Sequence, residues 1–359
     1  MTKNYSYTDA GVNRAQRVES KKALKNLQET YKNSQYGSIM RLPYGNIFPF
    51  GQNSFLDLVV EGVGTKVLLA QLAGKNDTIG IDAVAMAVND VIRSGAKPLA
   101  IVDNIHAQES NPELVKEWLK GIIQGANEAE CPVTGGETGD VAEIIRGLVP
   151  NAGFDMVVAS IGMVERQEII GGENIKPNDP IIGLPSSGLH SNGITLARKI
   201  LFKQWGGKYA PNDIPDGLDR EIVLEALEPT RIYVKPLLKL AREVKIKAAV
   251  HITGDAYTKF NNLTNYSPHI GFEFNNFKPK PIFGLIQKTA AELGFRITDE
   301  EMYKTFNMGW GFGVIIDDSD TEFALELLEK DNSAPEVIGK VTDKQAVEIV
   351  LQNKRMILT

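Results

Sequence analysis

The chain has 359 residues, and because a single hydrophobic core rarely extends over that length, we expect two domains. Its hydrophobic content of 43% is ordinary for a globular protein, and 39 Lys and Arg residues against 45 Asp and Glu residues give a net charge of -6. Nucleic-acid-binding domains usually carry a basic face, so this charge argues against nucleic acid as a partner.

Membrane insertion and disulfide bonding are not expected either. No apolar run approaches the ~20 residues that a membrane-spanning helix needs, and the first residues, MTKNYSYTDAGVNR, lack the apolar core of a signal peptide. Cys131 is the only cysteine, which excludes an intrachain disulfide and agrees with a reducing compartment. We therefore expect a cytoplasmic protein.

The chain before residue 55 predicts a surface helix followed by a loop. Residues 13–33 carry apolar positions diluted by many charges, which is typical of a helix on the surface. Residues 34–54 mix aromatic residues with glycines and prolines. This pattern indicates a loop that either lies over a ligand or packs against its own domain.

A strand, a glycine-rich turn and a lysine follow, and they form the first candidate site. The Val and Leu residues of 55–60 predict a short strand that leads directly into Gly62 and Gly64. Without Cβ atoms, these glycines let backbone N–H groups approach an anion, and Lys66 adds a positive charge beside them. The alternative is an ordinary tight turn with a solvated Lys66.

Carboxylate and amide side chains predict a metal site beside this turn. Asn89 and Asp90 end the apolar run at residues 83–88, about one helix after the glycines. Oxygen ligands from two elements near a glycine turn suit Mg²⁺ that is bound together with a phosphate. In the alternative interpretation, Asp90 only pairs with a helix end.

Residues 98–164 predict further strands and a helix. The apolar run at 98–104 predicts a buried strand, and Asn111 and Pro112 supply an N-cap and a first-turn proline for a helix that ends near Glu130. Another apolar strand is expected at 154–164. Strands that alternate with helices indicate an α/β layer architecture.

The segment CPVTGGETGD repeats the pattern of strand, glycines and carboxylate. A short strand leads into Gly135, Gly136 and Glu137, and Thr138 adds a hydroxyl donor. At the end of its strand, Glu137 could share the cation with Asp90, or it could form a capping box for a following helix.

A polar segment at 165–179 marks the expected boundary between domains 1–168 and 169–359. The second domain opens with a strand at 180–184, a loop of small polar residues, and a helix. Hydroxyl groups at a helix N-terminus are good anion ligands, because unpaired N–H groups and the helix dipole point at the loop. In this loop His190 is predicted to contact a phosphate or to transfer a proton, although a loop histidine alone is more often a hydrogen-bonded surface residue.

Later elements complete the second domain. They are a helix or helix pair at 229–244, a strand at 248–253, helices at 281–293 and 298–303, a glycine-containing strand after 305, a helix near 321–330 and two short strands. His251 lies inside its strand and is predicted to be structural. Strand-end glycines with polar neighbours recur in both halves, which indicates a ligand cleft between two α/β domains.

Eight segments in the same order resemble one enzyme family. They are YTDAGV at 7–12, GVGTK at 62–66, DTIGIDAVAMAVND at 77–90, GGET at 135–138, GLPSSGLHSNG at 183–193, LEPTRIYVKP at 227–236, HITG at 251–254 and EEMYKTFNMG at 300–309. The family is that of phosphoribosylformylglycinamidine cyclo-ligase, or aminoimidazole ribonucleotide synthetase, of purine biosynthesis. Related ATP-using enzymes, such as thiamine-monophosphate kinase and selenophosphate synthetase, share some of these segments.

The resemblance implies a fold and a set of partners. The fold is α/β and α+β in two domains: an N-terminal ATP-binding and metal-binding domain whose sheet pairs with that of a second subunit, and a C-terminal α+β domain. The implied homodimer binds ATP, Mg²⁺ and formylglycinamidine ribonucleotide. It converts the ribonucleotide to aminoimidazole ribonucleotide with release of ADP and phosphate.

The resemblance also implies residue roles. The predicted metal ligands are Glu61, Asp90 and Glu137. The predicted catalytic residues are Lys66, His190 and Asp90. The predicted ATP and phosphate contacts are Gly62, Gly64, Thr65, Lys66, Asn89, Gly135, Gly136 and Thr138. The predicted substrate contacts are Ser187, Ser191, Asn192, Thr253 and Asn307.

Several positions depart from the family pattern. Glu61 replaces an Asp, residues 38–50 lack a glycine-phenylalanine-glycine loop, residues 139–147 replace a methionine- and proline-containing run, and Asp255 and Ala256 replace glycines. Two other functions are therefore kept as alternatives. One is a small-molecule kinase of the same superfamily, and the other is a catalytically silent subunit that binds nucleotide or supports a larger assembly.

Overall fold

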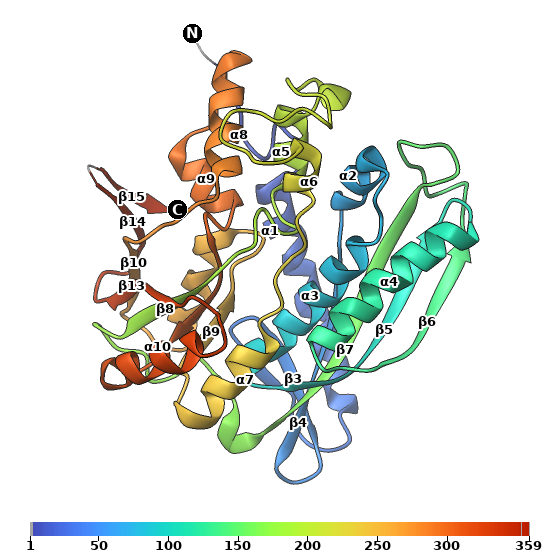
Figure 1. The fold of residues 1–359 in the computed structure, drawn as a ribbon. Coiled ribbons are helices and arrows are strands. Elements are labelled where there is room, and N and C mark those ends of the chain that lie inside the picture. The colour runs from blue at the N-terminus through green and yellow to red at the C-terminus, as the bar shows by residue number, and fades with distance from the viewer. Residues whose placement is uncertain (1–2, 353, 359) are drawn as a thin grey trace.

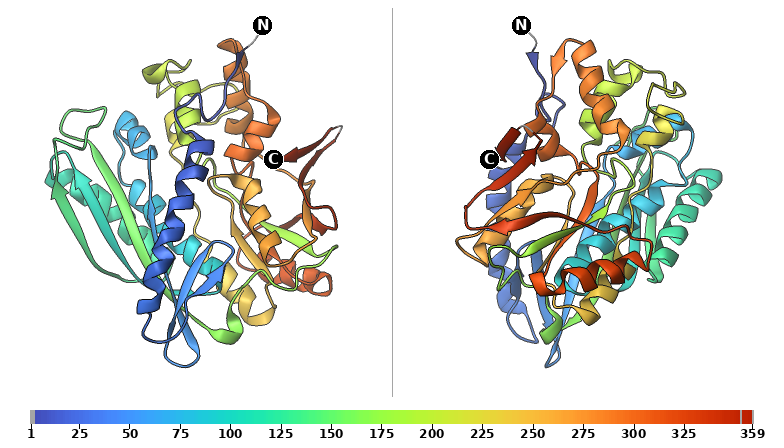
Figure 2. Two further views of the ribbon diagram at one scale, coloured as in Figure 1. Left: turned by 180° about the vertical axis from the view of Figure 1, so that it is seen from behind. Right: turned by 60° about the vertical axis from the view of Figure 1, so that its left-hand side comes forward.

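The computed structural model describes residues 3–352 and 354–358 (Figure 1). Two large sheets form its frame: one has six strands in the order β2-β3-β4-β7-β5-β6, and the other has seven in the order β15-β14-β10-β13-β8-β12-β9. The first sheet and α2 to α4 occupy one side of the molecule, and the second sheet occupies the other (Figures 1 and 2). Within the described ranges, no helix combines the length and the apolar character needed to cross a membrane.

The first half of the chain forms the six-stranded sheet and its helices. Its strands are β2 (Met40–Leu42), β3 (Gly45–Phe50), β4 (Ser54–Gly62), β5 (Lys97–Ala107), β6 (Val133–Asp140) and β7 (Phe154–Glu165). Its helices are α1 (Arg14–Ala23), α2 (Lys66–Ala73), α3 (Ile79–Val91) and α4 (Pro112–Glu128), with 3₁₀ turns η1 (Leu24–Asn33), η2 (Ile92–Ser94) and η3 (Arg166–Glu168).

The second half forms the seven-stranded sheet. Its strands are β8 (Pro180–Pro185), β9 (Ala248–His251), β10 (Gly271–Phe274), β12 (Trp310–Ile315), β13 (Glu336–Thr342), β14 (Val347–Leu351) and β15 (Lys354–Leu358). Its helices are α5 (Ile194–Leu201), α6 (Ile222–Ala226), α7 (Val234–Glu243), α8 (Pro281–Glu292), α9 (Asp299–Thr305) and α10 (Thr321–Glu329). Its 3₁₀ turns are η4 (Lys203–Trp205), η5 (Ala256–Asn265) and η6 (Asp318–Asp320).

Helix α3 is the buried centre of the first half. All of its residues are buried, because it lies between the six-stranded sheet, α4 and the second half of the chain. Glycines permit this packing: a Cβ added to Gly80 would come within 2.2 Å of the Ile122 nitrogen in α4, and one added to Gly121 would come within 2.4 Å of the Asp77 oxygen. The backbones of α3 and α4 therefore cross in direct contact.

The opposite face of the six-stranded sheet is open and apolar. Leu58 and Val60 of β4 are 56% and 60% exposed, and Val102 of β5 is 42% exposed. Val60 and Val102 both pair with Ala159 of β7, so they share one face across three strands. Since side chains alternate along a strand, Asp57 and Glu61 point to the other face, toward α3.

The two halves of the chain share one hydrophobic core. A single cluster of buried side chains runs from α3 through β7 to β8, β9 and β12. The N-terminal residues also join the halves, because β1 (Lys3–Asn4) pairs in parallel with β11 (Phe295–Arg296). Helix α1 then runs along the junction of the halves (Figure 2).

The predicted order of strands and helices is confirmed for most of the chain, although the sequence does not predict β10 and β15, and residues 34–54 need a correction. Residues 34–54 are not only a loop, since β2 and β3 form a hairpin that continues into β4. Ile47 of β3 and Phe55 of β4 belong to a small separate core. Alternating burial in β3 therefore outweighs the glycines and prolines that predicted a loop.

Candidate active site

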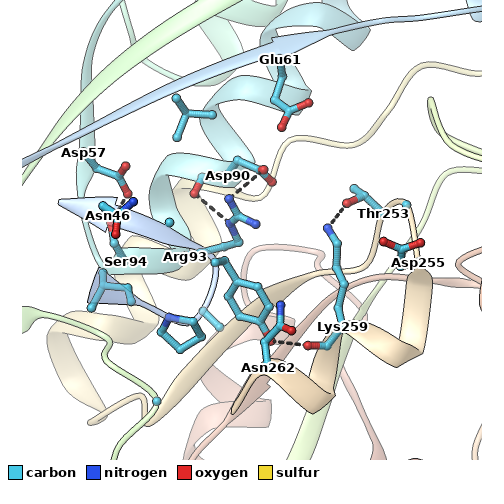
Figure 3. A pocket seen from close by; sticks show the side chains of 18 of the residues that line it. Asn46, Asp57, Glu61, Asp90, Arg93, Ser94, Thr253, Asp255, Lys259 and Asn262 are labelled. Atoms are coloured by element: carbon cyan, nitrogen blue, oxygen red, sulfur yellow. Dashed lines mark hydrogen bonds and ion pairs between the residues drawn. The ribbon is translucent and has the colours of Figure 1, made fainter. Parts of the chain in front are cut away.

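A cavity of about 510 Å³ opens at the junction of the two halves (Figure 3). Side chains from α1, β4, α3, the β2–β3 hairpin and the turn after β9 line it. Its charged lining residues are Arg17, Lys21, Asp57, Glu61, Asp90, Arg93, Asp255 and Lys259. A cavity of this size, with groups of both charges converging on it, can hold a small metabolite.

Asp90 is held between the Arg93 guanidinium and the His251 ring at the end of α3. Its Oδ2 lies 2.7 Å from Arg93 Nη2, and its Oδ1 accepts from His251 Nδ1 at 2.7 Å. Burial alone would raise the pKa of Asp90, but the Arg93 guanidinium and the His251 bond outweigh it and hold this pKa below its ordinary value. Asp90 is therefore a permanent carboxylate whose two oxygens are both engaged by the protein.

Glu61 is the contrasting carboxylate. Burial raises the pKa of Glu61 to about 7, and the negative charge of the neighbouring Asp90 contributes to this rise. Among the described residues, no basic nitrogen lies within 4 Å of its carboxylate oxygens. The Glu61 carboxyl is open to a ligand, and it can exchange a proton near neutral pH.

Asp57 lies deeper in the cavity. It precedes Glu61 on β4, and the two side chains point to the same face of the sheet. Ser94 Oγ donates to its Oδ2 at 2.7 Å. Burial raises the pKa of Asp57 to about 6, although the Ser94 bond and the Arg93 charge oppose the rise. The cavity thus contains two carboxyls with raised pKa values, Asp57 and Glu61, around one with a lowered pKa, Asp90.

Lys259 and Tyr44 form the opposite wall. Lys259 Nζ donates to the His251 carbonyl at 3.1 Å and to Thr253 Oγ1, and its carbonyl accepts from the Tyr44 hydroxyl at 3.2 Å (Figure 3). The Arg93 guanidinium lies over the Tyr44 ring at 5.3 Å. The β2–β3 hairpin therefore closes one side of the cavity through Tyr44.

Four of the predicted site residues line this cavity. They are Glu61, Asp90, Asn192 and Thr253. The sequence analysis missed Asp57, Arg93, Asp255, Lys259 and the two basic residues of α1. A signal existed for two of them: Arg93 follows Asp90 by about one helical turn, and Lys259 follows the HITG segment by five residues.

Lys66 lies elsewhere, in the packed junction of the halves. Its side chain is fully buried, and its Nζ lies 2.8 Å from Asp82 Oδ1 and 2.7 Å from the Glu228 carbonyl. Asp82 Oδ1 also accepts from the Thr230 backbone N–H at 2.8 Å and from Ser191 Oγ at 3.2 Å. Lys66 and Ser191 therefore join α2, α3 and the segment before α7.

His190 is also enclosed in this junction. Its φ of 61° places it in the left-handed region, and its Nε2 accepts from the Ser187 backbone N–H at 3.1 Å. Burial lowers the pKa of His190 well below its ordinary value, so the ring is neutral. Its position favours a role in fixing the Ser187–Asn192 loop.

Two amides tie the same junction together. Asn307 Oδ1 accepts from Ser186 Oγ at 2.8 Å, and its Nδ2 donates to the Gly188 carbonyl at 2.8 Å. Asn89 accepts from the Tyr233 backbone N–H and donates to the Arg231 carbonyl, both at 2.8 Å. Ser187 Oγ donates to the Pro229 carbonyl. All of these groups satisfy buried backbone atoms.

Glu137 lies on the other face of the six-stranded sheet. It is exposed on the edge strand β6, where it pairs with Asn104 of β5. Asn104 pairs in turn with Val157 of β7, and Val157 pairs with Gly62 of β4. This row of residues faces away from α3, whereas Glu61 faces α3. Glu137 is therefore separated from Glu61 and Asp90 by three strand spacings and by the sheet itself.

The predicted glycines and threonines near these positions do not line the cavity. Gly135, Gly136 and Thr138 are exposed on β6, and Gly64 turns the chain into α2 with a φ of 67°. Thr65 Oγ1 lies 2.9 Å from Thr195 Oγ1 in α5.

The three predicted metal ligands are not gathered in one place. Over residues 3–352 and 354–358, no group of three or more His, Cys, Asp or Glu side chains is arranged to hold a metal ion. Asp90 is occupied by Arg93 and His251, and Glu137 is on the far side of the sheet. The residues of a single chain do not fit a resident Mg²⁺ at this position.

Comparison with known proteins defines the class of the fold. Residues 46–164 match the family model "AIR synthase related protein, N-terminal domain", and residues 176–352 match the corresponding C-terminal domain. Among solved structures, the HypE–HypF complex aligns with a TM-score of 0.59 over 87% of this chain and 92% of that chain, at 18% identity. Thermotoga maritima PurL complexed with FGAR aligns with a TM-score of 0.60 over 87% of this chain and 46% of that chain, at 13% identity. The protein thus has the two-domain AIR-synthase-like fold that the sequence predicts.

Curated relatives identify the family within this class. The chain is 40% identical to phosphoribosylformylglycinamidine cyclo-ligase of Pyrococcus furiosus, over 85% of this chain and 84% of the relative. It is 38% identical to the enzyme of the same name of Methanocaldococcus jannaschii, over 95% of this chain and 93% of the relative. The chain belongs to the phosphoribosylformylglycinamidine cyclo-ligase family, as the eight sequence segments predict.

Proposed function

We propose that the protein is an ATP-dependent cyclo-ligase that converts formylglycinamidine ribonucleotide to aminoimidazole ribonucleotide, ADP and phosphate. Family membership over most of the chain is the observation that carries this proposal. The cavity supports it, because it offers an open carboxyl with a raised pKa together with amide, hydroxyl and cationic groups.

The proposed chemistry has two steps. The formyl oxygen attacks the terminal phosphorus of ATP, and ADP leaves. The formamide N–H gives up its proton as its oxygen is phosphorylated. The nitrogen that bears the ribose then attacks the formyl carbon and loses its proton, and the carbon–oxygen bond breaks as phosphate leaves and the ring closes. A proton shift from the ring CH2 to the exocyclic nitrogen completes the aromatic aminoimidazole. The two bond-forming steps depend mainly on holding the reacting groups in line and on accepting the proton that the ribose-bearing nitrogen loses.

Glu61 is the residue that we propose accepts this proton. Its raised pKa of about 7 suits proton transfer at neutral pH, and among the described residues no cationic nitrogen lies within 4 Å of its carboxylate. Asp90 acts as a positioning residue, because it fixes Arg93 and His251 at the cavity wall. Asn192 and Thr253 supply polar contacts to the substrate.

In this proposal, Mg²⁺ enters the site as part of the substrate MgATP. Mg²⁺ is commonly bound by nucleotide phosphates with one or two carboxylates rather than by a cage of protein ligands. The lack of a gathered three-ligand group in the described chain agrees with this arrangement. No step of the proposal depends on a resident metal ion.

We propose that the chain forms a homodimer through the open face of the six-stranded sheet. Contiguous exposed apolar patches of this kind usually mark protein interfaces, and Leu58, Val60 and Val102 form such a patch. Glu137 and Gly62 lie on the same face. Any part that they take in ATP binding would therefore depend on the second subunit.

The remaining proposals concern organisation and location. We retain the boundary between domains 1–168 and 169–359, which is supported by the end of the first sheet at Glu165 and the start of the second at Pro180. We place the protein in the cytoplasm, because the proposed reaction consumes ATP.

The test is an assay of the purified protein with MgATP and formylglycinamidine ribonucleotide. ADP, phosphate and aminoimidazole ribonucleotide should form in equal amounts. Formation of ADP and a phosphorylated product without free phosphate would instead identify a kinase. A folded protein that forms no ADP in the presence of the ribonucleotide would contradict the proposal.

A further inference from the structure

Lys259 is a cation in the cavity wall that has no carboxylate partner. It extends from η5 back toward β9, so that its Nζ reaches the His251 carbonyl and the Thr253 hydroxyl (Figure 3). Both of these acceptors are neutral. Over the described ranges, no carboxylate oxygen lies within 4 Å of Nζ.

Three other enclosed basic residues among those that the structure describes are each paired with a carboxylate. Lys66 lies 2.8 Å from Asp82, Lys247 lies 2.7 Å from Asp179, and Arg93 lies 2.7 Å from Asp90. A charge removed from water without a partner is costly, and proteins normally supply a counter-ion. Lys259 departs from this rule at the wall of the cavity.

The acidic groups around Lys259 do not compensate for its burial. Asp90, Glu61 and Asp255 act on it only from a distance, and burial lowers the pKa of Lys259 to about 8. Asp255 is directed toward α1, where its Oδ1 lies 3.8 Å from Arg14 Nε. Asp90 is already neutralised by Arg93.

Further hydrogen-bond donors lie beside the ammonium. Gly254 and Asp255 line the cavity, and their backbone N–H groups have no acceptor within the described part of the chain. Together with the Thr253 hydroxyl and the Lys259 ammonium, they form one short turn rich in donors. A phosphate group, with several charged oxygens, matches such a set better than a carboxylate does.

We propose that Lys259 binds a phosphate group of the ligand in this cavity, with the Thr253–Asp255 turn supplying the other hydrogen bonds. The inference deepens the proposed cyclo-ligase function, since it assigns a residue that recognises a phosphorylated substrate. Two sources share this chemistry: the phosphate of the ribonucleotide and the phosphates of ATP.

The test uses the full-length protein and the variants Lys259→Met, Lys259→Arg and Lys116→Met. Met keeps the length of the side chain without its charge, Arg restores the charge, and Lys116 is an exposed lysine of α4 far from the cavity. Titration calorimetry is carried out with formylglycinamidine ribonucleotide, with its dephosphorylated ribonucleoside, with ATP and with inorganic phosphate.

In the expected result, Lys259→Met weakens the binding of a phosphorylated ligand roughly 10- to 100-fold, and Lys259→Arg restores part of it. Binding of the ribonucleoside stays unchanged, and Lys116→Met behaves as wild type. If Lys259→Met loses affinity for the ribonucleotide alone, the phosphate of the ribonucleotide is the bound group. If it loses affinity for ATP alone, Lys259 binds the phosphates of ATP.

Two results would overturn the inference. One is unchanged binding of the ribonucleotide, ATP and inorganic phosphate by Lys259→Met. The other is an equal loss of affinity for ribonucleotide and ribonucleoside.

The parallel assay of turnover keeps the two proposals separable. A wild-type protein without turnover contradicts the cyclo-ligase function, while the binding of inorganic phosphate still tests Lys259. A wild-type protein with full turnover and a Lys259→Met variant with unchanged affinities contradict only the role of Lys259.

Discussion

At the scale of single residues, the site is defined by neighbouring carboxyls in different protonation states. Glu61 and Asp90 face the same cavity, yet Asp90 is fixed as an anion by Arg93 and His251, whereas burial makes Glu61 easy to protonate. Neighbouring groups whose pKa values are pushed apart are typical of acid–base sites.

Replacement of Glu61 tests its proposed role in proton transfer. Glu61→Gln should lower kcat by roughly 100-fold or more, because Gln cannot accept the proton released on ring closure. In wild type, kcat/KM should rise with pH around the Glu61 pKa of about 7, and this rise should be absent from the variant. Steady-state kinetics at several pH values measure both effects, with Glu61→Asp as the control that keeps a carboxylate. An unchanged pH profile in Glu61→Gln would rule out this role.

Asp57 should couple stability to pH. Its folded pKa of about 6 lies above the ordinary value of 3.8, so the folded state binds more protons in the window between them. The free energy of unfolding therefore falls as the pH rises through this window, by about 3 kcal/mol at most from this group. Urea unfolding of wild type and Asp57→Asn at acidic and neutral pH should show a smaller fall for the variant. Equal falls would mean that Asp57 is not buried as described.

At the scale of elements, close packing of α3 against α4 positions Asp90. Gly121→Ala would place a Cβ 2.4 Å from the Asp77 oxygen, so the helices must separate, and the free energy of unfolding should fall by roughly 2 kcal/mol. Gly284→Ala in α8 is the matched control. A Cβ there meets nothing within 4 Å, so this variant should gain about 0.5–1 kcal/mol from helix propensity. Chemical denaturation compares them, and a Gly121→Ala protein as stable as wild type would contradict the described packing.

The elements also show what could be predicted from sequence. The strands that end at Gly62 and near His251, and the apolar helix that carries Asp90, follow from local patterns. The pairing of Lys66 with Asp82 and Glu228 could not be predicted, because Glu228 is distant along the chain. A lysine after a glycine turn looks like a phosphate ligand until its buried partners are known.

The same limit applies to the faces of the sheet. Motif order places Glu61 and Glu137 next to comparable glycines, but alternation and strand pairing direct them to opposite faces. Lys259, by contrast, reaches the cavity through a local fold-back of η5 on β9, which brings its ammonium to the His251 carbonyl. Predictions from motifs therefore identify the family more reliably than they identify the residues that meet in space.

At the scale of the whole molecule, the open sheet face predicts association. Wild type should sediment with twice the chain mass of 39.4 kDa. Val102→Lys should shift it toward the monomer, because a charge in an apolar interface is costly to bury. Ile214→Lys is the control, since Ile214 is also exposed, at 60%, but lies outside the sheet. Analytical ultracentrifugation that finds a monomer for wild type, or an intact dimer for Val102→Lys, would contradict the proposed interface.

The central claim is that ATP activates the formyl oxygen of the ribonucleotide before ring closure. The most direct measurement is turnover of formylglycinamidine ribonucleotide carrying ¹⁸O in its formyl group, with mass analysis of the phosphate released. If the formyl oxygen is phosphorylated and leaves as phosphate, each phosphate should carry one labelled oxygen. Unlabelled phosphate, with the label recovered in water, would contradict the account.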